Sequence, residues 1–89
     1  MTRRTVFYSG RVQGVGFRYT THAIALKFSV SGFVRNLADG RVELVVEGAE
    51  DEVERLVTAI GAELRSNIRD AAISDSLATG EFTSFSITR

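Results

Sequence analysis

The sequence VSGFVRNLADGRVELVVE, residues 30–47, carries the strongest local signal in this chain. Residues 30–36 and 41–47 are rich in β-branched residues, and apolar positions alternate along both, as in half-buried strands. The apolar faces carry Val30, Gly32 and Val34 in the first strand and Val42, Leu44 and Val46 in the second. Between the strands, Leu37-Ala38-Asp39-Gly40 ends in an Asp-Gly pair, which supplies the positive φ of a tight turn. We therefore predict a β-hairpin over this stretch.

Upstream of the hairpin, the pattern changes from that of a strand to that of a helix. Residues 5–12 (TVFYSGRV) are rich in β-formers and predict a first strand. The glycine-rich residues 13–16 (QGVG) follow as a loop. Apolar and small residues then recur at helical spacing, at Phe17, Thr21, Ile24 and Phe28. We predict a helix of roughly three turns that begins directly after the loop and ends near Phe28.

Downstream of the hairpin, Gly48-Ala49 precedes a second helical pattern. Its first turn is acidic, which suits the positive end of a helix dipole, and holds Glu50, Asp51 and Glu52. One apolar stripe follows, made of Val53, Leu56, Val57, Ile60 and Leu64. Gly61 interrupts this helix and destabilises it by ~1 kcal/mol relative to alanine.

The remaining residues predict two more strands. Residues 71–77 form a weaker strand with Ala71, Ile73 and Leu77 on one side, and Phe85–Ile87 forms a short last strand after a turn at Gly80. The order is β-α-β-β-α-β plus a short last strand, which is the ferredoxin-like split β-α-β plan of an α+β protein. We expect two helices on one face of a mainly antiparallel sheet, and one domain over residues 1–89. In this plan we expect the strand that ends at Asn36 to run beside the first strand.

Composition excludes several classes of protein. Lys and Arg number 11 and Asp and Glu number 11, so the net charge is zero, unlike that of a general nucleic-acid or polybasic membrane binder. Cysteine is absent, which excludes disulfides, cysteine-ligated metals and cysteine nucleophiles, and His22 is the one histidine. No apolar run has the ~18 residues of a membrane-spanning helix, so we expect a cytoplasmic protein. We expect the Arg3-Arg4 pair to be part of a solvated terminus.

The loop between the first strand and the first helix reads GRVQGVGFR, residues 10–18. It does not match the dinucleotide-binding motif, which would need a glycine at position 19, where this chain has Tyr19. It does not match the P-loop either, because it lacks the terminal Gly-Lys-Ser/Thr of that motif. It does hold the parts of an anion site: glycines that let amide N–H groups turn inward, a helix N-terminus, and Arg18 as a two-pronged donor. The alternative is that the glycines serve only to turn the chain and that Arg18 forms a structural ion pair.

Two further side chains are candidates for a site. Asn36 ends a strand, from where it could approach the glycine-rich loop, but an asparagine before a turn is often only a turn residue. His22 lies one turn after Arg18, where it is either a catalytic base or a solvated helix residue. Tyr8 and Tyr19 are core or rim residues, and no role is assigned to them.

Three motifs together resemble the acylphosphatase family: the loop of residues 10–18, Gly32-Phe33-Val34-Arg35-Asn36, and Asp39-Gly40-Arg41-Val42-Glu43. The resemblance is close from about Val6 to Gly48 and looser beyond. It implies a ferredoxin-like fold and metal-independent hydrolysis of the carboxyl–phosphate bond of acyl phosphates, with no cofactor. It also implies that Arg18 binds phosphate and that Asn36 holds the attacking water. The residues implied as the amide cradle for the phosphate are Gln13, Gly14, Val15, Gly16 and Phe17.

The chain departs from the family pattern at three places. Ser29 stands where the family usually has a helix-ending glycine, Phe33 replaces a usual tryptophan, and residues 66–72 lack a Gly-Pro pair. These departures bear on stability and on the shape of the substrate loop more than on the chemistry.

Two alternatives to a stand-alone acylphosphatase remain open. One is a non-enzymatic module that binds RNA or a small regulatory molecule, although the zero net charge and the lack of paired exposed aromatics count against RNA. The other is a module of a larger carbamoyl-phosphate-handling enzyme, although we expect the chain to be complete at 89 residues. For the leading interpretation we expect a monomer that binds a small acyl phosphate, with inorganic phosphate or sulfate as a simpler ligand, and neither nucleic acid nor a membrane.

Overall fold

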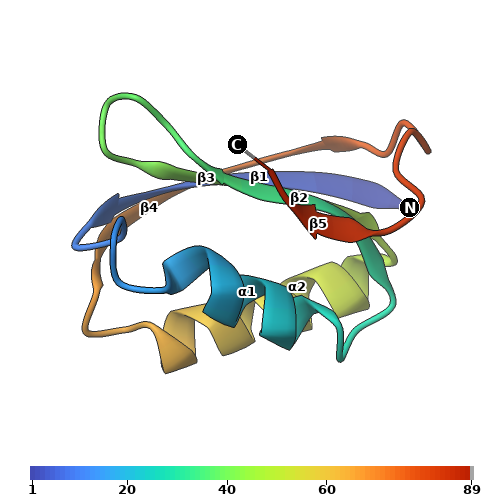
Figure 1. The fold of residues 1–89 in the computed structure, drawn as a ribbon. Helices are drawn as coiled ribbons and strands as arrows, with labels where there is room; N and C mark the ends of the chain where they lie inside the picture. Colours follow the sequence, from blue (N-terminus) through green and yellow to red (C-terminus); the bar gives the residue numbers. More distant parts are fainter. Residues whose placement is uncertain (89) are drawn as a thin grey trace.

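The structure is a computed structural model that describes residues 1–88. Its elements are β1 (Thr2–Gly10), α1 (Phe17–Ala25), β2 (Val30–Asn36), β3 (Val42–Gly48), α2 (Glu50–Glu63), β4 (Ile68–Leu77) and β5 (Phe85–Ile87). The strands form one five-stranded sheet, and both helices lie on the same face of it, which makes a two-layer sandwich (Figure 1). This arrangement confirms the predicted ferredoxin-like α+β fold.

The order of strands in the sheet is β4-β1-β3-β2-β5. Pairing is antiparallel between neighbours except for β2 and β5, which are parallel. The expectation that β2 runs beside β1 is wrong, because β3 turns back from the hairpin and inserts between them, pairing with both. Since β1 and β2 are each antiparallel to β3, they run in the same direction. Their carboxyl ends, and therefore the glycine-rich loop and Asn36, lie at the same edge of the sheet.

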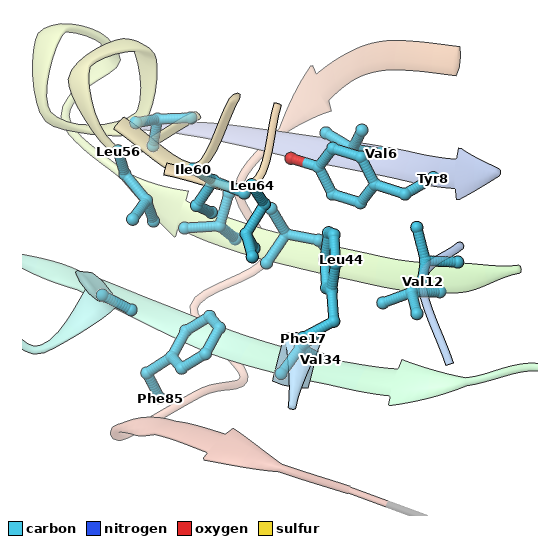
Figure 2. Close-up of a cluster of buried hydrophobic side chains, with 14 residues drawn as sticks. Val6, Tyr8, Val12, Phe17, Val34, Leu44, Leu56, Ile60, Leu64 and Phe85 are labelled. Atoms are coloured by element: carbon cyan, nitrogen blue, oxygen red, sulfur yellow. The ribbon is translucent and has the colours of Figure 1, made fainter. Parts of the chain in front are cut away.

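The hydrophobic core lies between the sheet and the helices. Alternate side chains of the central strands face inward, as the period of two requires, and the stripe of α2 packs onto them. Figure 2 shows Val6, Tyr8 and Leu44 of the sheet opposite Leu56, Ile60 and Leu64. The core residues that are essentially inaccessible to solvent include Val6, Phe17, Val34, Val42, Leu44, Val46, Val53, Leu56 and Ile60.

The predicted boundaries differ from the structure where apolar periodicity and backbone hydrogen bonding diverge. α1 ends at Ala25, before Phe28, because the next N–H groups bond to nearer carbonyls: Lys27 to Ile24 and Phe28 to Ala25. Phe28 still packs on the core, which explains the helical spacing that extends to it. β4 begins at Ile68 rather than at residue 71, and its side chains are exposed from the next residue onward, because it is an edge strand.

Arg3 and Arg4 do not form a solvated terminus, and that expectation is wrong because β1 already begins at Thr2. Arg3 Nε lies 2.7 Å from Glu47 Oε2, and its Nη2 donates to Glu81. Arg4 Nε lies 2.8 Å from Asp75 Oδ1, and its Nη1 lies 2.6 Å from Glu54 Oε2. The two adjacent side chains point to opposite faces of the sheet, so each face gains an ion-pair cluster.

Replacement of Gly61 by alanine is expected to stabilise the protein. Gly61 lies inside α2, and an added Cβ would meet no atom within 4 Å other than its own neighbours and the nearby backbone of the helix. Alanine lowers the backbone entropy of the unfolded chain, which is worth roughly 0.5–1 kcal/mol. The midpoint of thermal unfolding should rise by a few degrees.

Gly32→Ala is the matched control, because a Cβ there would lie 1.9 Å from the Val45 carbonyl oxygen. This control variant should be clearly destabilised. A Gly61→Ala protein that unfolds at a lower temperature than the parent would contradict the prediction.

Candidate active site

The loop between β1 and α1 is held at its start by bonds to the segment before β4 and turns at two glycines. The Arg11 N–H donates to the Asn67 carbonyl at 2.9 Å, and Asn67 Nδ2 donates to the Arg11 carbonyl at 3.1 Å, which ties the loop to the segment before β4. Gly14 and Gly16 have φ of 75° and 79°, values that side-chain-bearing residues rarely adopt. Both are exposed, so their backbone rather than any packing role accounts for glycine at these positions.

Within residues 1–88, the first amide groups of α1 have no hydrogen-bond partner. The Thr20 N–H makes the first helical bond, to the Gly16 carbonyl, so the N–H groups of the three residues between them have no intrahelical acceptor. No side chain caps this end, and no acidic residue lies in the first turn. By contrast, α2 has three acidic residues in its first turn. The positive end of α1 is therefore open to an anion.

The loop, the helix N-terminus and Asn36 enclose a hollow of about 220 Å³. Its lining consists of Val12, Gly14, Gly16, Phe17, Arg18, Tyr19 and Asn36. The structure thus brings Arg18 and Asn36 together from α1 and β2, across the intervening β3. Gln13 and Val15 do not line the hollow: Val15 is exposed, and the side chain of Gln13 is bonded to the β2–β3 hairpin.

Two polar side chains of the hollow, Arg18 and Asn36, have unused hydrogen-bonding capacity within residues 1–88. Within residues 1–88, no carboxylate forms an ion pair with Arg18, whereas Arg3, Arg4, Arg35 and Arg41 are all paired. Asn36 Oδ1 is buried and accepts no hydrogen bond from the described part of the chain. A buried acceptor without a donor is unfavourable, so its presence in a hollow indicates a ligand or a water that donates to it.

The hairpin holds Asn36 at a defined position. Asn36 pairs with Val42 at the end of the ladder, and beyond it the Leu37 N–H donates to the Arg41 carbonyl at 2.8 Å. Asp39 accepts from the Arg41 N–H at 3.0 Å and from its Nε at 2.8 Å. These bonds hold the pKa of Asp39 below its usual range, the backbone N–H contributing most. The turn after Asn36 is therefore internally braced.

Of the other sequence candidates, His22 does not line the hollow, and its ring lies 6.1 Å from that of Phe85. Tyr8 is a core residue, 5.1 Å from the ring of Phe17, and burial raises the pKa of its hydroxyl. Tyr19 and Val12 line the hollow, although sequence reasoning gave neither a role. The position of Tyr19 directly after Arg18 could have indicated that it lines the hollow. Val12, a buried residue beyond the end of β1, had no sequence feature that indicated this.

A larger hollow, of about 620 Å³, lies at the other end of the sheet beside Met1, Phe28 and Glu47. Burial would raise the pKa of Glu47, but the N–H groups of Thr79 and Gly80 and the Arg3 guanidinium outweigh it and lower the pKa to about 2. Those donors occupy the carboxylate, and Arg3 is itself held by two acids. The Arg3 guanidinium is therefore already engaged, whereas Arg18 at the smaller hollow has no ion pair within residues 1–88, so the smaller hollow is the candidate site.

Two further features of residues 1–88 concern metals and membranes. In this part of the chain no three His, Asp or Glu side chains come together as a possible metal site. None of its helices combines the length and the apolar character needed to cross a membrane.

The fold and the hollow define a two-layer ferredoxin-like protein with a glycine-rich loop beside a hollow at one end of the sheet. The sequence profile of the acylphosphatase family matches residues 4–87, and the chain belongs to that family. It is 50% identical over 74 residues to an acylphosphatase of Haloarcula marismortui, covering 81% of this chain and 80% of that one. It is 58% identical over 57 residues to an acylphosphatase of Trichormus variabilis, which covers 64% of this chain but only 56% of the relative's length. The crystal structure of acylphosphatase from Bacillus subtilis matches with a TM-score of 0.89 at 33% identity, over 100% of both chains.

Proposed function

We propose that this protein hydrolyses acyl phosphates to a carboxylate and inorganic phosphate, without a metal ion. The observation that carries the proposal is the hollow that Arg18, the open N-terminus of α1 and Asn36 line together. Within residues 1–88, Arg18 has no ion-pair partner and the buried Asn36 Oδ1 has no donor. Membership of the acylphosphatase family supports the same reaction.

We expect the phosphate group of the substrate to bind between the loop amides at the N-terminus of α1 and the Arg18 side chain. Amide N–H groups of residues 13–18 donate to its oxygens, and the Arg18 guanidinium donates two parallel hydrogen bonds. Phosphoryl transfer depends mainly on positioning and on charge stabilisation, so these donors can supply what magnesium supplies in other enzymes. Gly14 and Gly16 allow the backbone to present its N–H groups to one point.

Asn36 positions the nucleophile. Its amide nitrogen has no basic lone pair, so it cannot remove a proton, but its Oδ1 can accept a hydrogen bond from a water. That water attacks phosphorus, the bond from phosphorus to the acyl oxygen breaks, and the electron pair leaves with the carboxylate. A carboxylate is a weak base and needs no proton from the enzyme, which accounts for a site without a general acid. The proton of the water passes to a phosphate oxygen of the substrate.

The same proposal includes a monomer in the cytoplasm and a single domain over residues 1–89. The proposed substrates are small and water-soluble. Inorganic phosphate or sulfate should occupy the hollow as the simplest ligand.

Benzoyl phosphate hydrolysis, measured with and without EDTA, tests the proposed function. We expect turnover that EDTA leaves unchanged, competitive inhibition by inorganic phosphate, and poor activity on an ordinary alkyl phosphate ester. The last follows because an alkoxide leaving group is far more basic than a carboxylate, and the described lining of the hollow holds no carboxyl or histidine side chain to protonate it. Loss of activity in EDTA with recovery in magnesium would refute metal independence, and no turnover at all would refute the reaction.

A further inference from the structure

The side chain of Gln13 connects the glycine-rich loop to the β2–β3 hairpin. Its Nε2 donates to the Leu37 carbonyl at 2.8 Å and to the Arg41 carbonyl at 2.9 Å, so both amide hydrogens are used. Within residues 1–88, the side-chain hydrogen bonds between this loop and the hairpin all come from Gln13. The side chain is only half-buried, so its contribution lies in these two bonds more than in packing.

The two acceptors lie directly beside Asn36. Leu37 follows Asn36 in the chain, and Arg41 precedes Val42, the residue paired with Asn36. The Leu37 N–H also donates to the Arg41 carbonyl, so Gln13 binds both residues of the hydrogen-bonded pair next to Asn36. The backbone of Gln13 leads directly into Gly14, which lines the hollow.

We propose that the Gln13 side chain is a positioning residue that sets where Asn36 lies relative to the phosphate-binding amides. The inference rests on the proposed function, in which the loop holds the phosphate and Asn36 holds the water. These two groups come from elements that are separated in the sheet by β3, so no shared ladder fixes their spacing. In-line attack requires that spacing to be correct, and a 1 Å error in position can lower a rate by about 100-fold.

The isosteric variant Gln13→Glu tests the role of the two N–H donors. A carboxylate cannot donate and would face two carbonyl oxygens, so the loop and the hairpin should separate. We expect kcat for benzoyl phosphate to fall roughly 10- to 100-fold. The inhibition constant of inorganic phosphate should change less than about threefold, because the backbone donors and Arg18 remain.

The pH dependence of Gln13→Glu provides a readout that a purely structural role would not give. Two facing carbonyl oxygens disfavour the charged carboxyl and raise its pKa, and below that pKa its O–H can donate to one of them. The charged groups of the hairpin, Asp39 and Arg41, are paired with each other, and Arg18 lines the hollow in both proteins. The ratio of variant to parent kcat should therefore rise as the pH is lowered.

Two more variants complete the experiment. Gln13→Leu removes the donors without adding charge, so it should lose kcat to a similar extent but show a ratio that does not depend on pH. It also keeps the test valid if Gln13→Glu does not fold at neutral pH. Asn67→Asp is the matched control, because it removes another amide-to-carbonyl bond on the same loop, at Arg11, away from Asn36. Its kcat should stay within about threefold of the parent.

The outcomes separate this proposal from the proposed function. Unchanged kcat in Gln13→Leu, a pH-independent ratio for a folded Gln13→Glu, or equal loss of kcat in Asn67→Asp would each overturn the positioning role. A parent protein that hydrolyses no acyl phosphate would instead refute the function. The NMR signals of the Asn36 side-chain NH₂ group, recorded with inorganic phosphate bound, then still test the position: they should shift in Gln13→Leu and not in Asn67→Asp.

Discussion

Arg18→Ala is expected to weaken phosphate binding and to slow the turnover of acyl phosphates at the same time. The guanidinium lines the hollow and has no ion-pair partner within residues 1–88, so the anion it would serve is the substrate. A hydrogen bond to a charged group is worth ~1.5–3 kcal/mol, so the loss of one such bond lowers kcat/KM roughly 10- to 150-fold. The measurement is the inhibition constant of inorganic phosphate beside kcat/KM for benzoyl phosphate.

Two companion variants separate the shape of Arg18 from its charge. Arg18→Lys should recover only part of the loss, because an ammonium keeps the charge but cannot make two parallel bonds to one phosphate. Arg11→Ala removes an exposed arginine from the same loop that does not line the hollow, and it should stay near the parent. An Arg18→Ala protein that binds phosphate as well as the parent would remove Arg18 from the site.

The fold was predictable from the sequence where local patterns and hydrogen bonding agree. The hairpin is the best example, since the predicted first strand matches β2 residue for residue and the Asp-Gly turn leads into β3. The lateral order of strands was not predictable in the same way. β1 and β2 are joined through α1, and β3 inserts between them in the sheet. No local sequence pattern shows whether a later strand will insert there.

The candidate site was also predictable only in part. Arg18, Asn36 and the two loop glycines were identified from motif resemblance, and the structure places all of them around one hollow. The sequence did not predict the hydrogen bonds of the Gln13 side chain to the hairpin, because their acceptors are carbonyls more than 20 residues away in the chain. Backbone carbonyls exist at every residue, so the sequence holds no mark of which ones a given amide will meet.

Asn36→Ala is expected to abolish most of the turnover while leaving phosphate affinity nearly unchanged. Its proposed contact is to the attacking water, and a water without that acceptor loses its near-attack geometry, which is worth on the order of 100-fold or more. The phosphate donors belong to the loop and to Arg18, which this change does not touch. The decisive comparison is kcat for benzoyl phosphate against the inhibition constant of inorganic phosphate.

Stability gives this prediction its internal control. Asn36 Oδ1 is a buried acceptor without a donor in the described chain, and removal of such a group costs little and can stabilise a protein. Asn36→Ala should therefore unfold at a urea concentration at or above that of the parent while it loses activity, as expected of a residue retained for function rather than for the fold. Asn36→Asp keeps an acceptor but places negative charge near the phosphate, so it should lose phosphate affinity as well. A well-folded Asn36→Ala protein with normal turnover would show that the water is held by another group, and the proposed mechanism would lose its nucleophile-positioning step.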